Sequence, residues 1–378
     1  MNLAPDGEAS MGTAWRWRTN FLLATCLLAA LAVKAPALQS ATRLERASTA
    51  LQTLLGWFDE STGLYKTTGW WNAANATTAL ADYSRVSKSK KYFTTLADTF
   101  VAAQNAHSGF LNKYYDDEGW WVLAWVDAYD LTGNKLYLSM AESIFADMAA
   151  SWDGTCGGGI WWSKDRNYKN AIANELFLSA AAHLANRDSV GQAGYLDWAN
   201  REWMWFAKSG MINAQNLVND GLRIDGGQQG AGTCTSNGRT TWSYNQGVVV
   251  GGLVELAKLN SDPSLIGTAH NIATSAITSL VDSNGILHDS CEPARCGADA
   301  PQFKGIFVRN LVALDVASPR PAYKSFVETN ADAIWDKSRG PDGRLGLVWS
   351  GPFGGDNASS QSSALDALIG AAALQSPE

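Results

Sequence analysis

The sequence is poor in positive charge, in histidine and in cysteine, and each shortage narrows the functions that it can perform. Acidic residues outnumber basic residues, 36 to 29, so the chain has no electrostatic reason to bind nucleic acid or an anionic membrane. The 4 histidines and 5 cysteines lack the spacing of a zinc site, and we expect no metal and no cofactor. The acidic residues leave one alternative open, a calcium site through Asp220 and Asp225.

Long apolar runs are also rare, and the one near the N-terminus has the order of a secretory signal. Arg16 and Arg18 precede "NFLLATCLLAALAV", and "APA" follows at 35–37. We therefore expect cleavage near Ala37, with residues 1–37 as signal peptide and 38–378 as the mature chain. An uncleaved membrane anchor is the alternative. The C-terminal "ALIGAAALQSPE" lacks the long apolar tail of a lipid-anchor signal. We expect a monomer that is secreted, extracellular or associated with a cell wall, with no stable membrane insertion.

Four cysteines lie outside the signal, and an even number in an oxidising compartment predicts two disulfides. Cys291 and Cys296 bracket "EPAR", a loop short enough to close locally, which leaves Cys156 to pair with Cys234. The spacing alone does not exclude the other pairings.

Two sequons mark candidate glycosylation sites, at Asn75 and at Asn357. Asn75 falls inside a predicted buried helix, where a glycan has little room. We expect Asn357 to be the better acceptor.

Alternation typical of strands is scarce, and apolar residues recur at helical spacing along nearly the whole chain. The glycine-rich "NDGLRIDGGQQGAGTCTSNGRTT" follows no predicted strand, which argues against a dinucleotide or phosphate-binding loop. The periodicity predicts twelve helices, near 41–58, 72–86, 88–105, 118–132, 134–151, 170–186, 190–208, 243–260, 264–281, 303–316, 321–337 and 358–374.

The predicted helices alternate in character, which indicates two concentric rings of six in a single domain over 38–378. The even-numbered helices are apolar nearly all round, as in "NQGVVVGGLVELAKL", whereas the odd-numbered ones carry charge on one face. If the even helices form a parallel inner ring, the segments before them meet at one mouth, together with the positive ends of the helix dipoles.

Those segments hold most of the unusual aromatic and polar residues of the chain. They include "KTTGWWNAAN", "NKYYDDEGWW", "GGGIWWSKDRNYKN", "RTTWSYNQG", "PQFKG" and "VWSGPFGGDN". Aromatic faces stack on the C–H faces of sugars, and amides and carboxylates bind hydroxyl groups. A single tryptophan beside a helix is more often part of the core. Three doublets before three buried helices favour a sugar-binding mouth.

The acidic run of "KYYDDEGWW" offers the residues that glycoside hydrolysis needs, because two carboxyl groups flank the bond that breaks. Adjacent Asp116 and Asp117 at a helix start can acquire different pKa values, since each charge opposes ionisation of the other. The alternative is that Asp-Asp-Glu merely caps the helix. We expect Glu118 to act as a cap in the first turn.

Five separated motifs, "GWWNAAN", "YYDDEGWW", "YKNAIANELF", "TWSYNQG" and "FKGIFVRNL", resemble those of glycoside hydrolase family 76, the endo-α-1,6-mannanases. The resemblance extends from about residue 55 to residue 370. It implies an all-α fold, an (α/α)6 barrel of twelve helices, and a retaining mechanism with Asp116 as nucleophile and Asp117 as general acid/base. The implied substrate is α-1,6-linked mannan.

The motifs supply further candidates for substrate contact: Trp71, Asn72, Tyr115, Trp120, Trp162, Asn170, Tyr244, Asn245, Gln246 and Lys304. Two other activities fit the same residues. A transglycosidase would transfer the glycan to a sugar hydroxyl instead of water, and a non-catalytic protein would only bind mannan. A polysaccharide lyase fits less well, because the mouth segments contain few arginines to neutralise a uronate.

Overall fold

The computed structural model describes residues 43–225, 233–294 and 296–375. Within these residues, the segments with helical periodicity form twelve α-helices. The predicted signal peptide lies outside these residues. The helices are residues 43–55, α2 (Trp70–Ser87), α3 (Phe93–Ala102), α4 (Tyr115–Thr132), α5 (Lys135–Ala149), α6 (Ala171–Ala185), α7 (Gln192–Phe206), α8 (Ser243–Ala257), α9 (Pro263–Ser279), α10 (Phe303–Ala317), α11 (Pro321–Lys337) and α12 (Ala358–Ala373).

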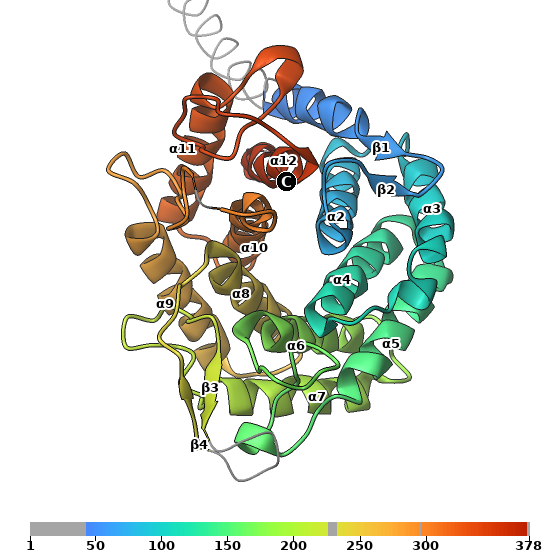
Figure 1. Cartoon of the computed structure of the whole chain (residues 1–378), viewed down its shortest axis with the longest axis vertical. Coiled ribbons are helices and arrows are strands. Elements are labelled where there is room, and N and C mark those ends of the chain that lie inside the picture. The colour runs from blue at the N-terminus through green and yellow to red at the C-terminus, as the bar shows by residue number, and fades with distance from the viewer. Residues whose placement is uncertain (1–42, 226–232, 295, 376–378) are drawn as a thin grey trace, which may run out of the picture.

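The even-numbered helices form a closed inner ring, as their apolar character predicted. Each of α2, α4, α6, α8 and α10 contacts the next even-numbered helix, and α12 contacts α2 (Figure 1). The other six helices lie outside this ring and cover it. Nearly every residue of α6, α8 and α12 is buried, whereas the outer α7 buries only three. The predicted twelve-helix toroid of two concentric rings is confirmed.

Glycine allows neighbouring inner helices to approach to backbone contact. A Cβ atom at Gly247 of α8 would lie 2.6 Å from the Cα atom of Phe307 in α10. A Cβ atom at Gly305 of α10 would lie 2.3 Å from the carbonyl oxygen of Ser363 in α12. Both distances are far below van der Waals contact, so a larger residue would force the helices apart.

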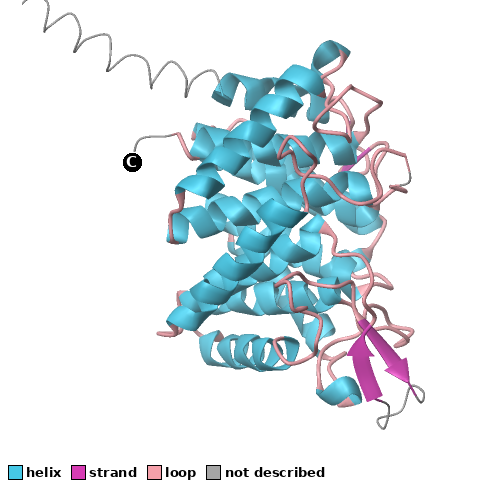
Figure 2. Ribbon diagram, turned by 90° about the vertical axis from the view of Figure 1, so that its left-hand side faces the viewer, coloured by secondary structure: helices cyan, strands magenta, loops and turns pink. Residues whose placement is uncertain are grey.

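Short extended segments were not predicted. β1 (Phe58–Asp59) pairs with β2 (Leu64–Tyr65), and β3 (Leu222–Asp225) pairs antiparallel with β4 (Thr233–Ser236). Figure 2 shows the β3–β4 hairpin outside the helical body. Strands of two to four residues show too little alternation for periodicity to reveal them. The helix predicted over 88–105 is also shorter, because Lys88 adopts a left-handed conformation that ends α2.

Both disulfides pair as predicted, Cys156 with Cys234 and Cys291 with Cys296. The first joins residues 78 positions apart and attaches β4 to the segment before α6. Among the described residues, no helix is long and apolar enough to cross a membrane.

Candidate active site

The N-terminal ends of five inner helices converge on a groove of about 600 Å³ at one end of the barrel. α2, α4, α6, α8 and α10 each contribute residues from their first turn or N-cap position. The remaining lining comes from the loops between helices. The groove is lined by Trp71, Tyr114, Asp116, Asp117, Trp120, Trp162, Tyr168, Asn170, Asp220, Arg239, Tyr244, Asp299 and Phe303.

Asp116 and Asp117 both line this groove, in the first turn of α4. The indole nitrogen of Trp162 donates a hydrogen bond to Asp116 Oδ2 at 2.9 Å. Asp116 Oδ1 is buried and has no hydrogen-bond partner among the described residues. The amide nitrogen of Asn112 donates to Asp117 Oδ2 at 2.6 Å. Each carboxyl group therefore keeps one oxygen available for a ligand or a proton.

The two carboxyl groups hold protons to higher pH than ordinary aspartates. Burial raises the pKa of Asp116 well above its usual value, and the negative charge of Asp117 raises it further. Burial and the charge of Asp299 raise the pKa of Asp117 to about 6, although the Asn112 hydrogen bond opposes the rise. The pair therefore retains a proton near neutral pH, and in the free protein Asp116 retains it longer.

Glu118 has a different role from the cap that we expected. Its side chain is fully buried, and its Oε1 atom accepts a hydrogen bond from the backbone N–H of Asn112, six residues earlier. Its carboxyl group also pairs with Lys164, with Nζ at 3.0 Å from Oε1. Burial raises the pKa of Glu118 to about 8. Glu118 therefore braces the segment that carries Asn112, outside the groove.

Four aromatic rings from four inner helices form a platform beside the carboxyl pair. The Trp71 ring lies 5.6 Å from that of Trp120 and 6.2 Å from that of Phe303, between centroids. Tyr244 closes the circle, at 3.9 Å from Phe303 and 6.5 Å from Trp120. All four contacts are stacked, and together they present apolar faces to a groove that also contains charged groups.

Each tryptophan doublet divides its two members between groove and core. Trp71, Trp120 and Trp162 line the groove. Their neighbours Trp121 and Trp161 are almost fully buried, and Trp70 packs against the ring of Trp121 at 4.8 Å. Adjacent residues on a helix point about 100° apart, so the doublets in the first turns of α2 and α4 serve both regions, whereas Trp161 and Trp162 lie in the loop before α6.

Of the ten predicted substrate contacts, the structure brings five to the groove: Trp71, Trp120, Trp162, Asn170 and Tyr244. Asn170 is also the N-cap of α6 and accepts a hydrogen bond from Ala173 N–H. The other five lie beneath or beside the groove: Asn72, Tyr115, Asn245, Gln246 and Lys304.

Contacts within the protein occupy three of those five side chains. Gln246 binds both the N–H and the carbonyl of Val218. Lys304 is almost fully buried, 2.6 Å from Glu292, and also donates to the carbonyl of Leu347. The Lys164 ammonium lies 5.5 Å from the ring centre of Tyr115. Asn72 and Asn245 are buried as well, and both side-chain polar atoms of Asn245 lack a partner among the described residues.

Six lining residues were not among the sequence candidates. Tyr114, Tyr168, Arg239 and Phe303 lie within the mouth segments already recognised, so the composition of those segments was the available signal. Loops between helices contribute the other two, Asp220, which the sequence had suggested only for calcium, and Asp299. Tyr168 donates to Asp220 Oδ2 at 2.5 Å and accepts from Asn237 at 2.8 Å, which fixes the loop around β3–β4 beside α6.

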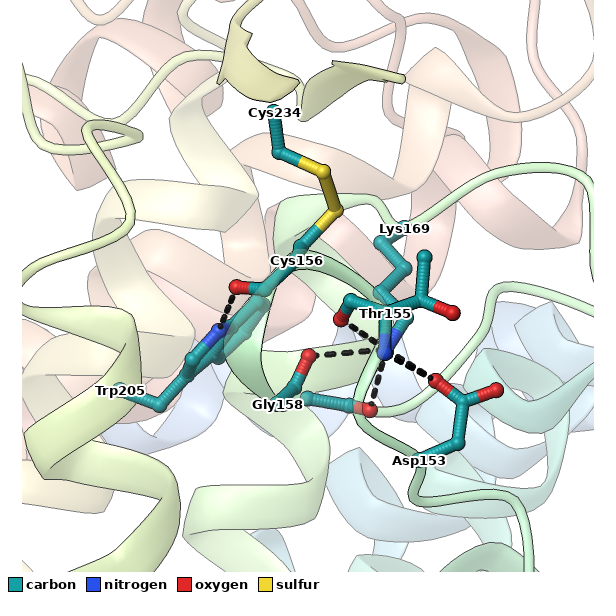
Figure 3. The surroundings of a disulfide bond; sticks show 8 residues. Asp153, Thr155, Cys156, Gly158, Lys169, Trp205 and Cys234 are labelled. Atoms are coloured by element: carbon teal, nitrogen blue, oxygen red, sulfur yellow. Dashed lines mark hydrogen bonds and ion pairs between the residues drawn. A yellow bond between two sulfur atoms is a disulfide. The ribbon is translucent and has the colours of Figure 1, made fainter. Parts of the chain in front are cut away.

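A buried lysine supports the wall of the groove next to Asn170. The Lys169 ammonium donates to Asp153 Oδ1 and to three backbone carbonyls, those of Thr155, Gly158 and Gly159, all at 2.8–2.9 Å (Figure 3). In the same segment, Trp205 donates to the Cys156 carbonyl, and Cys156 is bonded to Cys234. The ammonium and the disulfide thus hold together three segments distant in sequence.

The two sequons differ in exposure. Asn75 is 1% exposed, donates to the Trp71 carbonyl and accepts from Arg309. Asn357 is half-buried, and its Oδ1 atom caps α12 through Ser360 N–H. The preference for Asn357 as the glycan acceptor stays a prediction.

The acidic residues considered for calcium are occupied by other partners. Asp220 accepts the Tyr168 hydroxyl, and Asp225 pairs with Arg223 at 3.1 Å. Within the described part of the chain, no group of three or more His, Cys, Asp or Glu side chains has a metal-binding arrangement.

Paired carboxyl groups beside stacked aromatic rings in a groove are typical of the active site of a glycoside hydrolase. The sequence profile of glycosyl hydrolase family 76 matches residues 43–378, and the chain belongs to this family.

Relatives and solved structures agree with this membership. The mannan endo-1,6-alpha-mannosidase DCW1 of Candida albicans is 27% identical over 74% of this chain and 67% of its own length. DCW1 of Saccharomyces cerevisiae is 28% identical over 82% of this chain and 73% of its own. The α-1,6-mannanase GH76A of Salegentibacter sp. HEL1_6 shares the fold, with a TM-score of 0.79 and 21% identity over 88% of this chain and all of that one. An inactive variant of that mannanase, with two aspartates replaced, has been solved with α-1,6-mannotriose.

Proposed function

We propose that this protein is a secreted endo-acting hydrolase that cleaves α-1,6-mannosidic bonds in mannan and retains the anomeric configuration. The observation that carries the proposal is the Asp116–Asp117 pair, half-buried in the wall of a groove and retaining a proton near neutral pH. The curated relatives named as mannan endo-1,6-alpha-mannosidases support the choice of linkage and of endo cleavage.

In the proposed reaction, Asp116 attacks the anomeric carbon while Asp117 donates its proton to the glycosidic oxygen that leaves. A covalent mannosyl ester on Asp116 results. Asp117, now ionised, removes a proton from water, and the water oxygen displaces Asp116 from the sugar. The Trp162 hydrogen bond to Asp116 stabilises the ionised form that attack requires.

The protonation of the free pair opposes these roles, because Asp116 retains its proton longer than Asp117. The assigned roles therefore require the proton to lie on Asp117 when substrate is bound. The reverse assignment, with Asp117 as nucleophile and Asp116 as acid, needs no such transfer. Chemical rescue distinguishes the two, as described in the Discussion.

The aromatic platform supplies the binding surface. Trp71, Trp120, Tyr244 and Phe303 present stacked rings on which mannose residues on either side of the cleaved bond can lie. Asn170, on the neighbouring wall, offers its side-chain amide group for sugar hydroxyls, whereas the indole N–H of Trp162 is engaged with Asp116.

The direct test is incubation of residues 38–378 with linear and branched α-1,6-mannan, with product length and anomeric configuration followed by NMR. We expect short oligosaccharides of mixed length whose new reducing ends appear first as the α anomer. Release of mannose alone, or initial β anomer, would contradict endo cleavage or retention respectively. Products longer than the substrate, formed with an added acceptor, would show the transglycosidase alternative instead.

Secretion has a separate test. The order of charged, apolar and small residues over 16–37 supports an N-terminal signal, and two disulfides suit an oxidising compartment. We expect the protein recovered from the medium of a secreting host to begin near Leu38. Retention of the full N-terminus in a membrane fraction would favour the uncleaved anchor.

A further inference from the structure

Besides Asp220, one more carboxylate reaches the groove from a loop that no sequence motif marked. Asp299 lines the groove and precedes the short helix Ala300–Gln302, which leads into α10. Its Oδ1 atom accepts a hydrogen bond from the indole nitrogen of Trp71 at 2.9 Å. Trp71 belongs to the start of α2, so this contact joins the aromatic platform to the segment before α10, 228 residues away in sequence.

The segment before Asp299 is attached at several points. Cys291 and Cys296 are bonded to each other, and Glu292 forms the buried pair with Lys304 at 2.6 Å. Glu292 also accepts a hydrogen bond from the backbone of Asp289, whose carboxylate binds Ser243 at the start of α8. Lys304, which we had expected to touch substrate, thus secures the segment that presents Asp299.

We propose that Asp299 is a positioning residue of the reaction, which orients Trp71 for sugar stacking and adds a negative charge near the Asp116–Asp117 pair. The role of Asp299 in the reaction rests on the proposed function. The two physical claims about Asp299 concern the free protein and can be tested there.

The orienting claim follows from the geometry of Trp71. Stacking on Trp120 and Phe303 is not strongly directional, so it leaves the Trp71 indole some freedom to turn about its χ1 and χ2 torsions. The hydrogen bond to a carboxylate that is itself held by a fixed segment removes that freedom, and charge-assisted bonds are about twice as strong as neutral ones.

The charge claim concerns the proton that the mechanism assigns to Asp117. The groups around Asp117 are Asp116 and Glu118 on α4, Asp220, Arg239 and Asp299 on the loops, and the tyrosines 114, 168 and 244. Burial and the Asp299 charge raise the pKa of Asp117. Asp299 therefore favours a protonated Asp117, which is the state that the acid role requires.

Substitutions separate the two claims. Asp299→Asn keeps an oxygen for the Trp71 hydrogen bond and removes the charge, whereas Asp299→Ala removes both. Trp71→Phe keeps an aromatic ring and the charge. Asp225→Asn, at an exposed surface pair outside the groove, is the matched control for loss of one negative charge. Asp299 and Asp225 are exposed and Trp71 is half-buried, so folding should be preserved in all four variants.

The first measurement is the pH profile of kcat/KM on linear α-1,6-mannan. The second, made without substrate, is an NMR titration that follows the 13C-labelled aspartate carboxyl groups. The same NMR samples report the indole 15N shift of Trp71. For Asp299→Asn we expect the alkaline limb and the lower carboxyl titration to move down by about half a pH unit with KM unchanged. Asp299→Ala should add an altered Trp71 signal and a KM raised about five-fold, and Trp71→Phe should raise KM alone.

The proposal is overturned if Asp299→Asn matches Asp225→Asn in both titrations, or if Asp299→Ala leaves the Trp71 signal and KM unchanged. If the wild-type protein fails to cleave α-1,6-mannan, the proposed function fails. The NMR titrations then still decide whether Asp299 sets the charge and the orientation of the groove.

Discussion

The two ends of the barrel contain spaces of similar size but different electrostatic character. The groove encloses about 600 Å³ at the N-terminal ends of the inner helices, and a second cavity of about 550 Å³ lies toward their C-terminal ends. The groove has four carboxylates, Asp116, Asp117, Asp220 and Asp299, and one arginine. In the second cavity, which we call the rear cavity, residues from all six inner helices contribute acidic and basic groups in similar numbers.

One carboxyl group from each region represents the contrast. In the rear cavity, burial raises the pKa of Glu255, but His183, Arg187 at 3.2 Å and Lys258 outweigh the burial and lower its pKa to about 2. In the groove, the half-buried Asp116 forms no ion pair with a cation among the described residues, and desolvation of its carboxyl group raises its pKa well above the usual value. A cation alone does not decide the outcome, because burial raises the pKa of Asp127 and Asp366 in the rear cavity to about 7 although Arg85 and Arg309 oppose the rise.

The difference between the groove and the rear cavity shows which of the two regions is less favourable for folding. Helix C-termini favour cations, and the rear cavity places Arg85, Arg187 and Lys258 near them, where they form ion pairs with acidic partners. The groove keeps carboxyl groups together without neutralising them, which is unfavourable for folding and is typical of a catalytic site.

The largest effect that we predict is the loss of activity on neutralising either groove aspartate. Asp116→Asn and Asp117→Asn should each lower kcat/KM on α-1,6-mannan on the order of 10³-fold, because each removes a group that acts on the breaking bond. Initial rates measured with the same protein preparations and mannan concentrations give this ratio. Activity within ten-fold of wild type in either variant would remove that aspartate from the mechanism.

Chemical rescue then assigns the two roles. With an aryl mannoside whose leaving group needs no protonation, the variant that lacks the acid should regain activity when azide is added and yield the α-mannosyl azide. The variant that lacks the nucleophile cannot form the ester and should yield β-mannosyl azide or nothing. We expect α product from Asp117→Ala. The same product from Asp116→Ala would establish the reverse assignment.

At the rear cavity, loss of a carboxylate should impair stability and leave the chemistry intact. Glu255 has its pKa lowered in the fold, so its contribution is present above the usual value of 4.5 and is lost as pH falls toward 2. Glu255→Gln should therefore lower the free energy of unfolding by about 2 kcal/mol at pH 7, with kcat unchanged. Urea unfolding at pH 7 and at pH 3 measures this difference.

Asp225→Asn provides the matched control, because Asp225 pairs with Arg223 at the surface. We expect it to change stability by less than about 1 kcal/mol. If both variants lose the same stability, the rear cavity contributes no more than a surface pair.

Neutralising a carboxyl group in the groove should change the free energy of unfolding in the opposite direction. The pKa of Asp116 is raised in the fold, so folding becomes less favourable as pH rises from 3.8 through the folded value. Asp116→Asn removes this penalty and should stabilise the protein by about 1–2 kcal/mol at pH 8, with no gain near pH 3. Thermal unfolding across this range, on the inactive variant, tests the sign. Destabilisation at pH 8 would show that the groove contributes to folding after all.

The sequence was sufficient to predict the two concentric rings of helices, because a helix that is buried on all sides is apolar on nearly every face. α8 is apolar throughout, and its glycines permit contact with α10. The sequence also indicated Asp116 and Asp117, since adjacent acids between aromatic pairs at a helix start are unusual. The hairpin β3–β4 escaped prediction because four-residue strands depend on the disulfide at Cys234 and on neighbouring loops.

The rest of the site could not be predicted from composition. It depends on the direction in which each helical side chain points and on loops that are distant in sequence. Asn245 and Gln246 follow Tyr244 directly, yet only Tyr244 lines the groove, because each successive helical residue turns by about 100°. Asp299 reaches Trp71 only through the fixed segment around Cys291 and Glu292. No local pattern reveals such a contact.

The smallest predicted effect concerns a histidine in the rear cavity beside Glu255. Burial lowers the pKa of His183 to about 4, so the unfolded chain binds a proton that the folded protein does not between pH 4 and 6.5. Stability should rise with pH across this window. Because the ring remains one-fifth exposed, we expect about 1 kcal/mol in total. His183→Gln should flatten the pH dependence of unfolding from pH 4 to 6.5 and leave the Glu255-dependent loss below pH 4 in place. An unchanged slope between pH 4 and 6.5 would show that His183 does not contribute to the pH dependence of stability.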